Sequence, residues 1–208
     1  MDLEEKTREL KKIEREVAKC QKCALYKTRQ KTVPGEGNPA SDIMFVGEAP
    51  GAREDIEGRP FCGPAGKFLD QLLDSIGLRR DDVFIANTLK CRPPNNRDPE
   101  PAEKELCRMY LEEQIRVINP KIIVTLGRHS TETFLPGIGG ITKLRAKLYR
   151  RSTGRYFFPL YHPAAALHNG AMRQVLVDDF TKLPAAIERV RREAEKEVKE
   201  KTKNLKLF

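Results

Sequence analysis

The stretch IMFVGEAPG, residues 43–51, places a short apolar run directly before a turn rich in glycine and proline. Three further apolar runs of similar length, each bounded by Gly, Pro or Asn, span residues 83–86, 122–126 and 156–161. Short apolar runs bounded in this way are typical of buried strands. Helical stretches separate the four runs, and this alternation predicts an α/β fold in which a parallel sheet carries helices on both faces.

The helices expected around these strands carry start and stop signals. They span residues 3–19, 65–76, 99–118 and 128–134, and a last helix runs from about residue 171 into the charged tail. We expect Asp98 to cap the helix at 99–118, because its carboxylate can accept from free backbone amides and Pro99 suits the first helical position. Pro184 predicts a kink or a break in the last helix. Residues 30–41, rich in Gly and Pro, are expected to form a loop.

Polar side chains follow the predicted strands at the points where they end. Glu48 follows the first strand, Asn87 ends the second, His129 comes after the third and His162 after the fourth. Because ligands of open parallel sheets bind at the carboxyl ends of the strands, we expect an acid, an amide and an imidazole to gather along one edge. This convergence predicts an active site there.

The spacing of the cysteines indicates a metal site. Cys20 and Cys23 form a C-x-x-C pair, Cys91 follows the second strand, and Cys107 lies on the next helix. A site made only of thiolates selects zinc or an iron–sulfur cluster, and the spacing leaves this choice open. Cys107 also shares a helical face with apolar residues, so it could instead be an ordinary core residue. The fifth cysteine, Cys62, is expected to be a spare thiol.

The composition favours one cytoplasmic domain with an anionic partner. The 208 residues carry a net charge of +9, and basic side chains favour nucleic acid because neutralising phosphates releases counterions. No apolar run approaches the roughly 18–20 residues of a membrane span. Residues 1–19 are charged throughout, which predicts the absence of a signal peptide. We expect a single domain over residues 1–208, with a charged helical tail from about residue 185.

Several segments together resemble the family 4, iron–sulfur uracil-DNA glycosylases of bacteria and archaea. The matching pieces are GEAPG (47–51), GRPFCGPAGKFLD (58–70), NTLKCRPPNNR (87–97) and YHPAA (161–165), in that order and with the four cysteines in the family's order. The likeness spans roughly residues 20–180. It implies a three-layer α/β/α sandwich with a short four-stranded parallel sheet, and a structural [4Fe-4S] cluster on Cys20, Cys23, Cys91 and Cys107. It also implies a prokaryotic, nucleoid-associated enzyme of base excision repair.

The resemblance implies a monofunctional hydrolase that flips uracil out of DNA and cuts its N-glycosidic bond, leaving an abasic site. Phe61 is then the expected stacking platform for the flipped base. Asn87 is expected to read the uracil edge, because a carboxamide offers both a donor and an acceptor and mismatches cytosine. His162 is the expected catalytic group that stabilises negative charge on uracil O2.

The attacking water needs a carboxylate, and two candidates are present. Glu48 is expected to position or activate this water, with Asp55 as its rival. In other uracil glycosylases the first motif is GQDPYH, so this chain has Ala49 in place of the aspartate and Gly51 in place of the tyrosine that excludes thymine. Gly47 and Ala49 are expected to line the base pocket.

Contacts with DNA are expected outside the pocket. Leu167 is the candidate wedge that fills the gap left by the flipped base. Arg92, Arg97 and Lys67 are candidate phosphate contacts. Residues 203–208 loosely resemble terminal motifs that dock on sliding clamps, and a monomer is the expected state.

Three other functions remain open from the sequence. The same fold could act on another base, such as thymine or hypoxanthine opposite guanine. The chain could be a non-catalytic DNA-binding module that carries a cluster, or an electron-transfer protein. The combination of Asn87, Phe61 and His162 argues against both non-catalytic readings, because neither function needs these residues. His129 and His168 are expected to be structural or peripheral.

Overall fold

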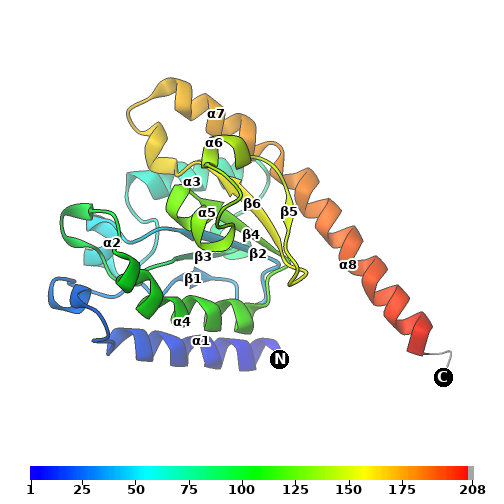
Figure 1. Ribbon diagram of the computed structural model, residues 1–208, viewed down its shortest axis with the longest axis horizontal. Coiled ribbons are helices and arrows are strands. Elements are labelled where there is room, and N and C mark those ends of the chain that lie inside the picture. Colours follow the sequence, from blue (N-terminus) through cyan, green and yellow to red (C-terminus); the bar gives the residue numbers. More distant parts are fainter. Residues whose placement is uncertain (206–208) are drawn as a thin grey trace.

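The computed structural model describes the backbone of residues 1–205, the side chains of residues 1–197 and that of residue 199. Its centre is a six-stranded sheet with the order β1-β3-β2-β4-β6-β5 (Figure 1). The strands are β1 (Glu36–Gly37), β2 (Ile43–Gly47), β3 (Phe84–Asn87), β4 (Ile122–Leu126), β5 (Tyr149–Arg150) and β6 (Tyr156–Leu160). All four inner strands are parallel to one another. The two edge strands pair antiparallel with their neighbours.

The predicted α/β class and the four parallel strands are confirmed. The expected total of four strands is wrong, because β1 and β5 extend the sheet by one strand at each edge. Each edge strand has only two residues, which is too short to give the alternating pattern by which a strand is recognised in a sequence.

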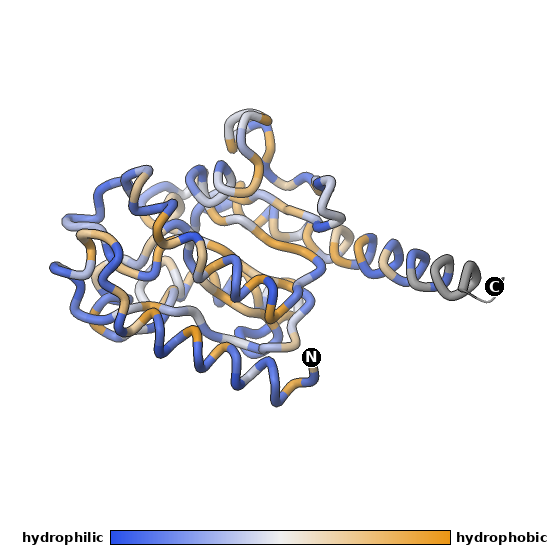
Figure 2. Tube along the Cα trace, turned by 60° about the horizontal axis from the view of Figure 1, so that its bottom comes forward, coloured by the Kyte–Doolittle hydropathy of each residue, from blue (hydrophilic) through white to orange (hydrophobic). Residues whose placement is uncertain are grey.

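Helices cover both faces of the sheet, as the alternation predicted. Helices α3 (Pro64–Asp74) and α7 (Gly170–Phe180) and the first turns of α8 (Leu183–Leu205) pack on one face, where they meet Ile43 and Phe45 of β2. Helix α4 (Pro101–Ile118) covers the other face, where it meets Met44 and Val46. Successive residues of β2 therefore face opposite layers, as the pleat of a strand requires. Apolar residues concentrate in these strands, and α8 extends beyond the body of the molecule (Figures 1 and 2).

The N-terminal helix α1 (Leu3–Ala18) lies outside α4 and forms part of a third apolar cluster. Ile13 and Val17 are its buried residues, and they pack with Leu25 and Tyr110. Figure 2 shows polar and apolar segments alternating along α1, as expected for a helix that buries one stripe. This cluster includes Cys20, Cys23, Cys91 and Cys107, so the N-terminal segment is attached to the body at that point.

Short elements complete the connections between strands and helices. The helices are α2 (Ala52–Glu57), α5 (Arg128–Phe134) and α6 (Ile141–Leu144), and the 3-10 turns are η1 (Ala24–Lys27), η2 (Arg80–Asp82), η3 (Pro94–Asn96) and η4 (Pro163–Ala166). Each of the four inner strands is followed in the chain by one of these elements: α2 after β2, η3 after β3, α5 after β4 and η4 after β6. No helix in the described part of the chain is both long and apolar enough to cross a membrane.

Two expected helix boundaries are wrong. Helix α4 begins at Pro101 rather than Pro99, with Glu100 as its N-cap, and the Glu103 carboxylate accepts from the Glu100 backbone N at 2.9 Å. Asp98 is therefore not the cap. The expected last helix is two helices, which are separated at residues 181–182, and Pro184 lies in the first turn of α8, where a proline is tolerated.

Candidate active site and cysteine cavity

A pocket opens at the carboxyl ends of the parallel strands. Its lining includes Glu48 after β2, Asn87 at the end of β3, His162 after β6, and Phe61 from the loop before α3. These four residues come from four separate segments of the chain. The structure thus brings an acid, an amide and an imidazole together at the edge of the sheet where they were predicted to meet.

Asn87 is the most buried polar side chain of the pocket. It is 2% exposed, and its Oδ1 is buried without a hydrogen-bond partner in the described part of the chain. Its backbone carbonyl accepts from the buried Lys90 ammonium at 2.9 Å. A buried acceptor with no partner costs free energy, so this amide is held ready for a donor from outside the protein.

Gly47 lets this amide sit where it does. It pairs with Asn87 across the parallel strands, and a Cβ atom on residue 47 would lie 2.3 Å from Asn87 Oδ1 and 2.7 Å from Phe61 Cζ. Any larger residue would therefore displace the groups that shape the pocket.

Phe61 forms one wall of the pocket and has an unusual backbone. Its φ is 50°, and its ring stacks on the His162 imidazole with 5.5 Å between ring centroids. Gly66 of α3 approaches so closely that a Cβ there would lie 1.6 Å from the Phe61 carbonyl oxygen. Arg80 donates to the same oxygen at 3.2 Å. These contacts fix the loop that presents the ring.

His162 is a neutral hydrogen-bond donor in this environment. Burial lowers the pKa of its imidazole to about 4. Its Nδ1 accepts from the Ala164 backbone N at 3.1 Å, so in the neutral ring the hydrogen is on Nε2. The ring abuts Gly127, where a Cβ would lie 3.1 Å from His162 Cβ. A neutral N–H held in this way can stabilise a developing negative charge.

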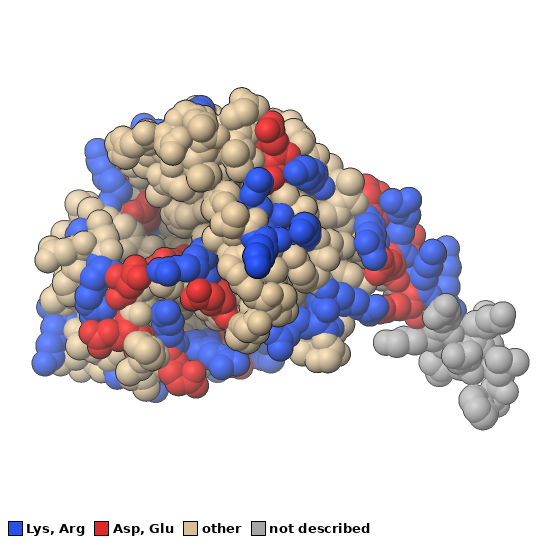
Figure 3. Space-filling model, turned by 45° about the horizontal axis from the view of Figure 1, so that its top comes forward, with Lys and Arg blue, Asp and Glu red and all other residues tan. Residues whose placement is uncertain are grey.

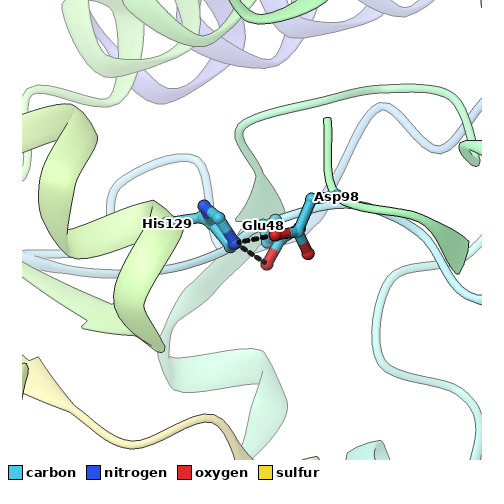
Figure 4. A group of neighbouring side chains, drawn as sticks. All are labelled: Glu48, Asp98 and His129. Atoms are coloured by element: carbon cyan, nitrogen blue, oxygen red, sulfur yellow. Dashed lines mark ion pairs between the residues drawn. The ribbon is translucent and has the colours of Figure 1, made fainter. Parts of the chain in front are cut away.

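Glu48 lies beside His129, which was expected to be structural or peripheral, and beside Asp98, which was expected to cap a helix. His129 points from α5 toward Glu48 and Asp98 (Figure 4). Its Nε2 lies 3.8 Å from Glu48 Oε2 and 3.2 Å from Asp98 Oδ2. Burial raises the pKa of the Glu48 carboxyl above its ordinary value, and His129 offsets part of this rise. His129, expected to be structural or peripheral, thus touches a pocket residue.

A comparison with protein families matches residues 34–187 to the uracil DNA glycosylase superfamily. The chain belongs to this superfamily. A type-4 uracil-DNA glycosylase of Sulfurisphaera tokodaii is 54% identical over 182 residues, which are 84% of this chain and 83% of the relative. A type-4 enzyme of Archaeoglobus fulgidus is 47% identical, over 82% of this chain and 89% of the relative. A type-4 enzyme of Thermotoga maritima is 42% identical, over 85% of this chain and 94% of the relative.

In this member of the uracil DNA glycosylase superfamily, the rival carboxylate Asp55 lies outside the pocket lining. It is 2% exposed in α2, and its Oδ1 accepts from the Gln30 backbone N at 3.1 Å. The neighbouring Glu54, which the sequence analysis missed, lines the pocket. Its two carboxylate oxygens accept from the backbone N atoms of Gly51 at 3.1 Å and Gly63 at 3.0 Å, so it ties two rims of the pocket together.

Of the four candidate DNA contacts of this superfamily member, one is part of the pocket lining. Leu167, at the end of η4, is 38% exposed. Arg97 lines the pocket and pairs with Glu103 at 2.6 Å, whereas Arg92 Nε donates to Asn96 at 2.7 Å. Lys67 is exposed on α3. On the face shown in Figure 3, basic side chains are interspersed with acidic ones, both on the body and along α8.

The four predicted metal ligands of this superfamily member line one cavity between α1 and α4. Cys20, Cys23, Cys91 and Cys107 share it with mostly apolar neighbours, while Cys62 lies outside. N–H groups point at two of the sulfurs: Arg29 Nη1 lies 3.2 Å from Cys91 Sγ, and the Lys90 backbone N lies 3.3 Å from Cys107 Sγ. An apolar cavity with four thiols and N–H donors to sulfur suits a bound metal centre.

The spacing of these sulfurs bears on the kind of centre. Zinc binds sulfur at about 2.3 Å, which puts the ligands of a tetrahedral site about 3.8 Å apart. Among the described residues, no three cysteine sulfurs lie within 4.8 Å of one another. The sulfurs are therefore spread more widely than the ligands of one tetrahedral zinc ion.

Proposed function

We propose that this chain is a uracil-DNA glycosylase that takes uracil from DNA into the pocket and hydrolyses its N-glycosidic bond. The observation that carries the proposal is the buried Oδ1 of Asn87, which has no hydrogen-bond partner among the described residues and lies in a pocket shared with Phe61 and His162. The relatives described above are type-4 uracil-DNA glycosylases by name, which supports the same activity. Base excision repair is the corresponding cellular role.

Uracil recognition follows from the donors and acceptors of the pocket. Asn87 Oδ1 accepts from uracil N3–H, and its Nδ2 donates to uracil O4, while the base lies against the Phe61 ring. Cytosine has an acceptor at N3 and a donor at its exocyclic amine, so both bonds to Asn87 would be lost. The buried Oδ1 would then remain unpaired, which makes this rejection costly for the wrong base.

The reaction breaks the bond between uracil N1 and the deoxyribose C1′, and the bonding electrons leave with the base. His162 Nε2–H donates to uracil O2, where negative charge collects. A water oxygen bonds to C1′, and Glu48 accepts the proton that this water loses. The uracil anion then takes up a proton from solvent and Glu48 returns its proton to solvent, so the products are free uracil and an abasic site. We favour Glu48 over Asp55 because Asp55 is buried against Gln30 outside the pocket lining.

We propose that Cys20, Cys23, Cys91 and Cys107 hold a [4Fe-4S] cluster. The separation of the cysteine sulfurs favours a cluster over zinc, and the N–H donors of Arg29 and Lys90 suit sulfur ligands that carry negative charge. The cluster supplies cross-links between the N-terminal segment and the body, and it takes no part in cutting the base.

For the DNA, we propose Leu167 as the wedge and Lys67, Arg92 and Arg97 as phosphate contacts. A monomer is sufficient, because the pocket residues all come from one chain. Residues 203–208 are the expected clamp-docking segment. The backbone of residues 206–208 and the side chains of the whole segment lie outside the described part of the chain.

The deciding experiment incubates the purified protein with oligonucleotides that carry one uracil, thymine, hypoxanthine or cytosine, and then applies alkali to reveal abasic sites. We expect strand breaks only at uracil, in the absence of added metal. Breaks at thymine or hypoxanthine would assign the pocket to another base. A folded sample that binds DNA but produces no breaks at any base would contradict the enzyme and favour a non-catalytic DNA-binding module.

The pH dependence of excision tests the role of Glu48. Because burial raises its pKa, the carboxylate form is lost at a higher pH than for an ordinary glutamate, and the rate should fall as pH decreases through that value. His162 stays neutral well above its pKa of about 4, so it should not cause this decline. The single-turnover rate of Glu48→Gln should be lower by about 10²-fold or more, and the fall of the rate at acidic pH (the acid limb of the profile) should be absent. Asp55→Asn should retain the limb, and a profile altered only by Asp55→Asn would reverse the assignment.

A further inference from the structure

Lys90 is a buried lysine whose amino group contacts Asn87 from outside the pocket. It is 1% exposed and does not belong to the pocket lining. Its Nζ donates to the Asn87 carbonyl oxygen at 2.9 Å and to Gln114 Oε1 at 2.6 Å. We infer that Lys90 is a positioning residue for uracil specificity, which fixes the backbone of Asn87 so that the carboxamide meets the edge of the base. This inference rests on the proposed function, in which Asn87 reads that edge.

The peptide group between Asn87 and Thr88 is held from both sides. Lys90 Nζ binds its carbonyl oxygen, while its N–H, on Thr88, donates to the Gly47 carbonyl oxygen at 3.0 Å. These two atoms point in opposite directions from a planar trans peptide group, so the two bonds together fix the orientation of its plane. Without Lys90 the plane could rotate about the bond that remains, and the Cα–Cβ direction of Asn87 would change with it.

The second partner of Lys90 keeps the amino group in place. Gln114, on α4, is 2% exposed, and its Nε2 donates to the Pro34 carbonyl oxygen at 2.7 Å. The Gln114 amide therefore has one orientation, in which Oε1 faces Lys90. The contacts from Pro34 to Asn87 thus have a donor facing an acceptor at each step. This holds whether the amino group of Lys90 is protonated or neutral, because both forms have at least two N–H bonds.

The Asn87 side chain has little freedom to be displaced and still read the base. A Cβ on residue 47 would lie 2.3 Å from Asn87 Oδ1, so the carboxamide rests directly on the Gly47 backbone. The turn that follows β3 also holds the neighbouring pocket residue, because Thr88 Oγ1 and the Leu89 backbone N donate to the Glu48 carbonyl oxygen at 2.5 and 2.9 Å. Lys90 therefore completes a turn that sets Asn87 and Glu48 relative to each other.

A role in the metal centre is the main alternative for Lys90. It precedes Cys91 and lines the cysteine cavity, and its backbone N lies 3.3 Å from Cys107 Sγ. That hydrogen bond comes from the backbone, however, and any residue except proline would keep it. The amino group binds the oxygens of Asn87 and Gln114 instead of a sulfur. A side-chain substitution therefore separates the two roles.

The test compares Lys90→Met with the unaltered protein in kcat/KM for a uracil-containing oligonucleotide and in Ki for free uracil, the product. Methionine keeps an unbranched stem but has no N–H donor. We expect kcat/KM to fall by about tenfold or more, because a misplacement of about 1 Å can cost about 10²-fold. Ki for free uracil should rise by a similar factor, since the same edge contacts hold the product. The bound iron should not change.

Asn87→Ala decides whether Lys90 acts through Asn87. Lys90→Met should lower kcat/KM by less than about twofold in the Asn87→Ala background, because no carboxamide is left to orient. A merely structural role would lower kcat/KM by the same factor in both backgrounds, and this result would overturn the inference.

Ser41→Ala is the matched control, because Ser41 is another buried side chain that holds a backbone carbonyl. Its Oγ donates to the Asp82 carbonyl oxygen at 2.8 Å, and it lies outside the pocket lining. The variant should leave kcat/KM and Ki unchanged even where it lowers Tm. If Lys90→Met does not fold, as judged by thermal unfolding, Gln114→Met carries the test, because it releases the amino group without altering the turn. It should lower kcat/KM by about threefold or more, and only where Asn87 is present.

The outcomes separate this inference from the function on which it rests. Absence of uracil excision by the unaltered protein would remove the proposed function, and full activity of Asn87→Ala would remove the role of Asn87. An impaired Asn87→Ala, together with Lys90→Met and Gln114→Met within about twofold of the unaltered protein, would overturn the positioning role alone.

Discussion

Replacing His162 with alanine is expected to lower the single-turnover rate of uracil excision by about 10²–10³-fold, or ~2.7–4 kcal/mol in activation free energy. The substitution removes the Nε2–H donor while Asn87 and Phe61 remain to hold the base. The Nδ1 bond to Ala164 and the low pKa, about 4, show that this donor is already neutral and oriented before any substrate arrives. The loss should therefore appear in the rate of bond cleavage, with little change in Kd for uracil-containing DNA.

His168→Ala is the control for this variant, because His168 is exposed and lies outside the pocket lining. It should excise uracil at the unaltered rate. A His162→Ala rate within about threefold of the unaltered protein would show that oxyanion stabilisation comes from another group, since removal of a real donor costs far more.

Replacing Cys91 with serine is expected to remove the metal centre and to lower Tm by about 10 °C or more. Metal-binding free energy stabilises the folded state directly, and each kcal/mol lost from a domain of this size lowers Tm by about 2–4 °C. The absorbance of the iron–sulfur cluster and the bound iron, measured by elemental analysis, should disappear together. Hydrogen exchange should increase most in α1 and residues 20–30, because the cysteines connect this segment to the body.

Cys62→Ser is the matched control, since Cys62 is a cysteine outside the cavity. It should retain the iron, the absorbance and the Tm. Stoichiometric zinc in place of iron would contradict the proposed cluster, and an unchanged Tm in Cys91→Ser would show that the centre does not stabilise the fold.

Much of the fold could be predicted from the sequence, because its signals are local. The apolar runs of β2, β3, β4 and β6 and the helical stretches between them indicated a parallel sheet before any contact was known. The start of α4 was misjudged, because Pro99 and Pro101 are equally good first helical residues. The choice depended on Glu103, whose carboxylate accepts from the Glu100 backbone N and pairs with Arg97. The edge strands β1 and β5 were missed because two residues are too few to show the alternation of apolar and polar side chains that indicates a strand.

Local sequence signals also predicted part of the candidate site. Glu48, Asn87 and His162 each follow the end of a strand, and the rule that ligands bind at that edge brought them together. His129 follows a strand end too, yet it was set aside because it lacked a motif. Neither Asp98 nor Glu54 carries a sequence signal for its place, because each depends on a contact between segments.

The sequence by itself determined the α/β class, the edge of the sheet where the site lies, and the four cysteines that share a cavity. These follow from periodicity, strand ends and spacing, which act over a few residues. Only the tertiary structure decided that Asn87 Oδ1 has no hydrogen-bond partner in the part of the chain that is described, and that His162 is neutral with its hydrogen on Nε2. It also decided that His129 rather than Asp55 lies beside Glu48. Such properties depend on burial and on distances of a few ångströms between distant segments, which exist only once the chain has packed.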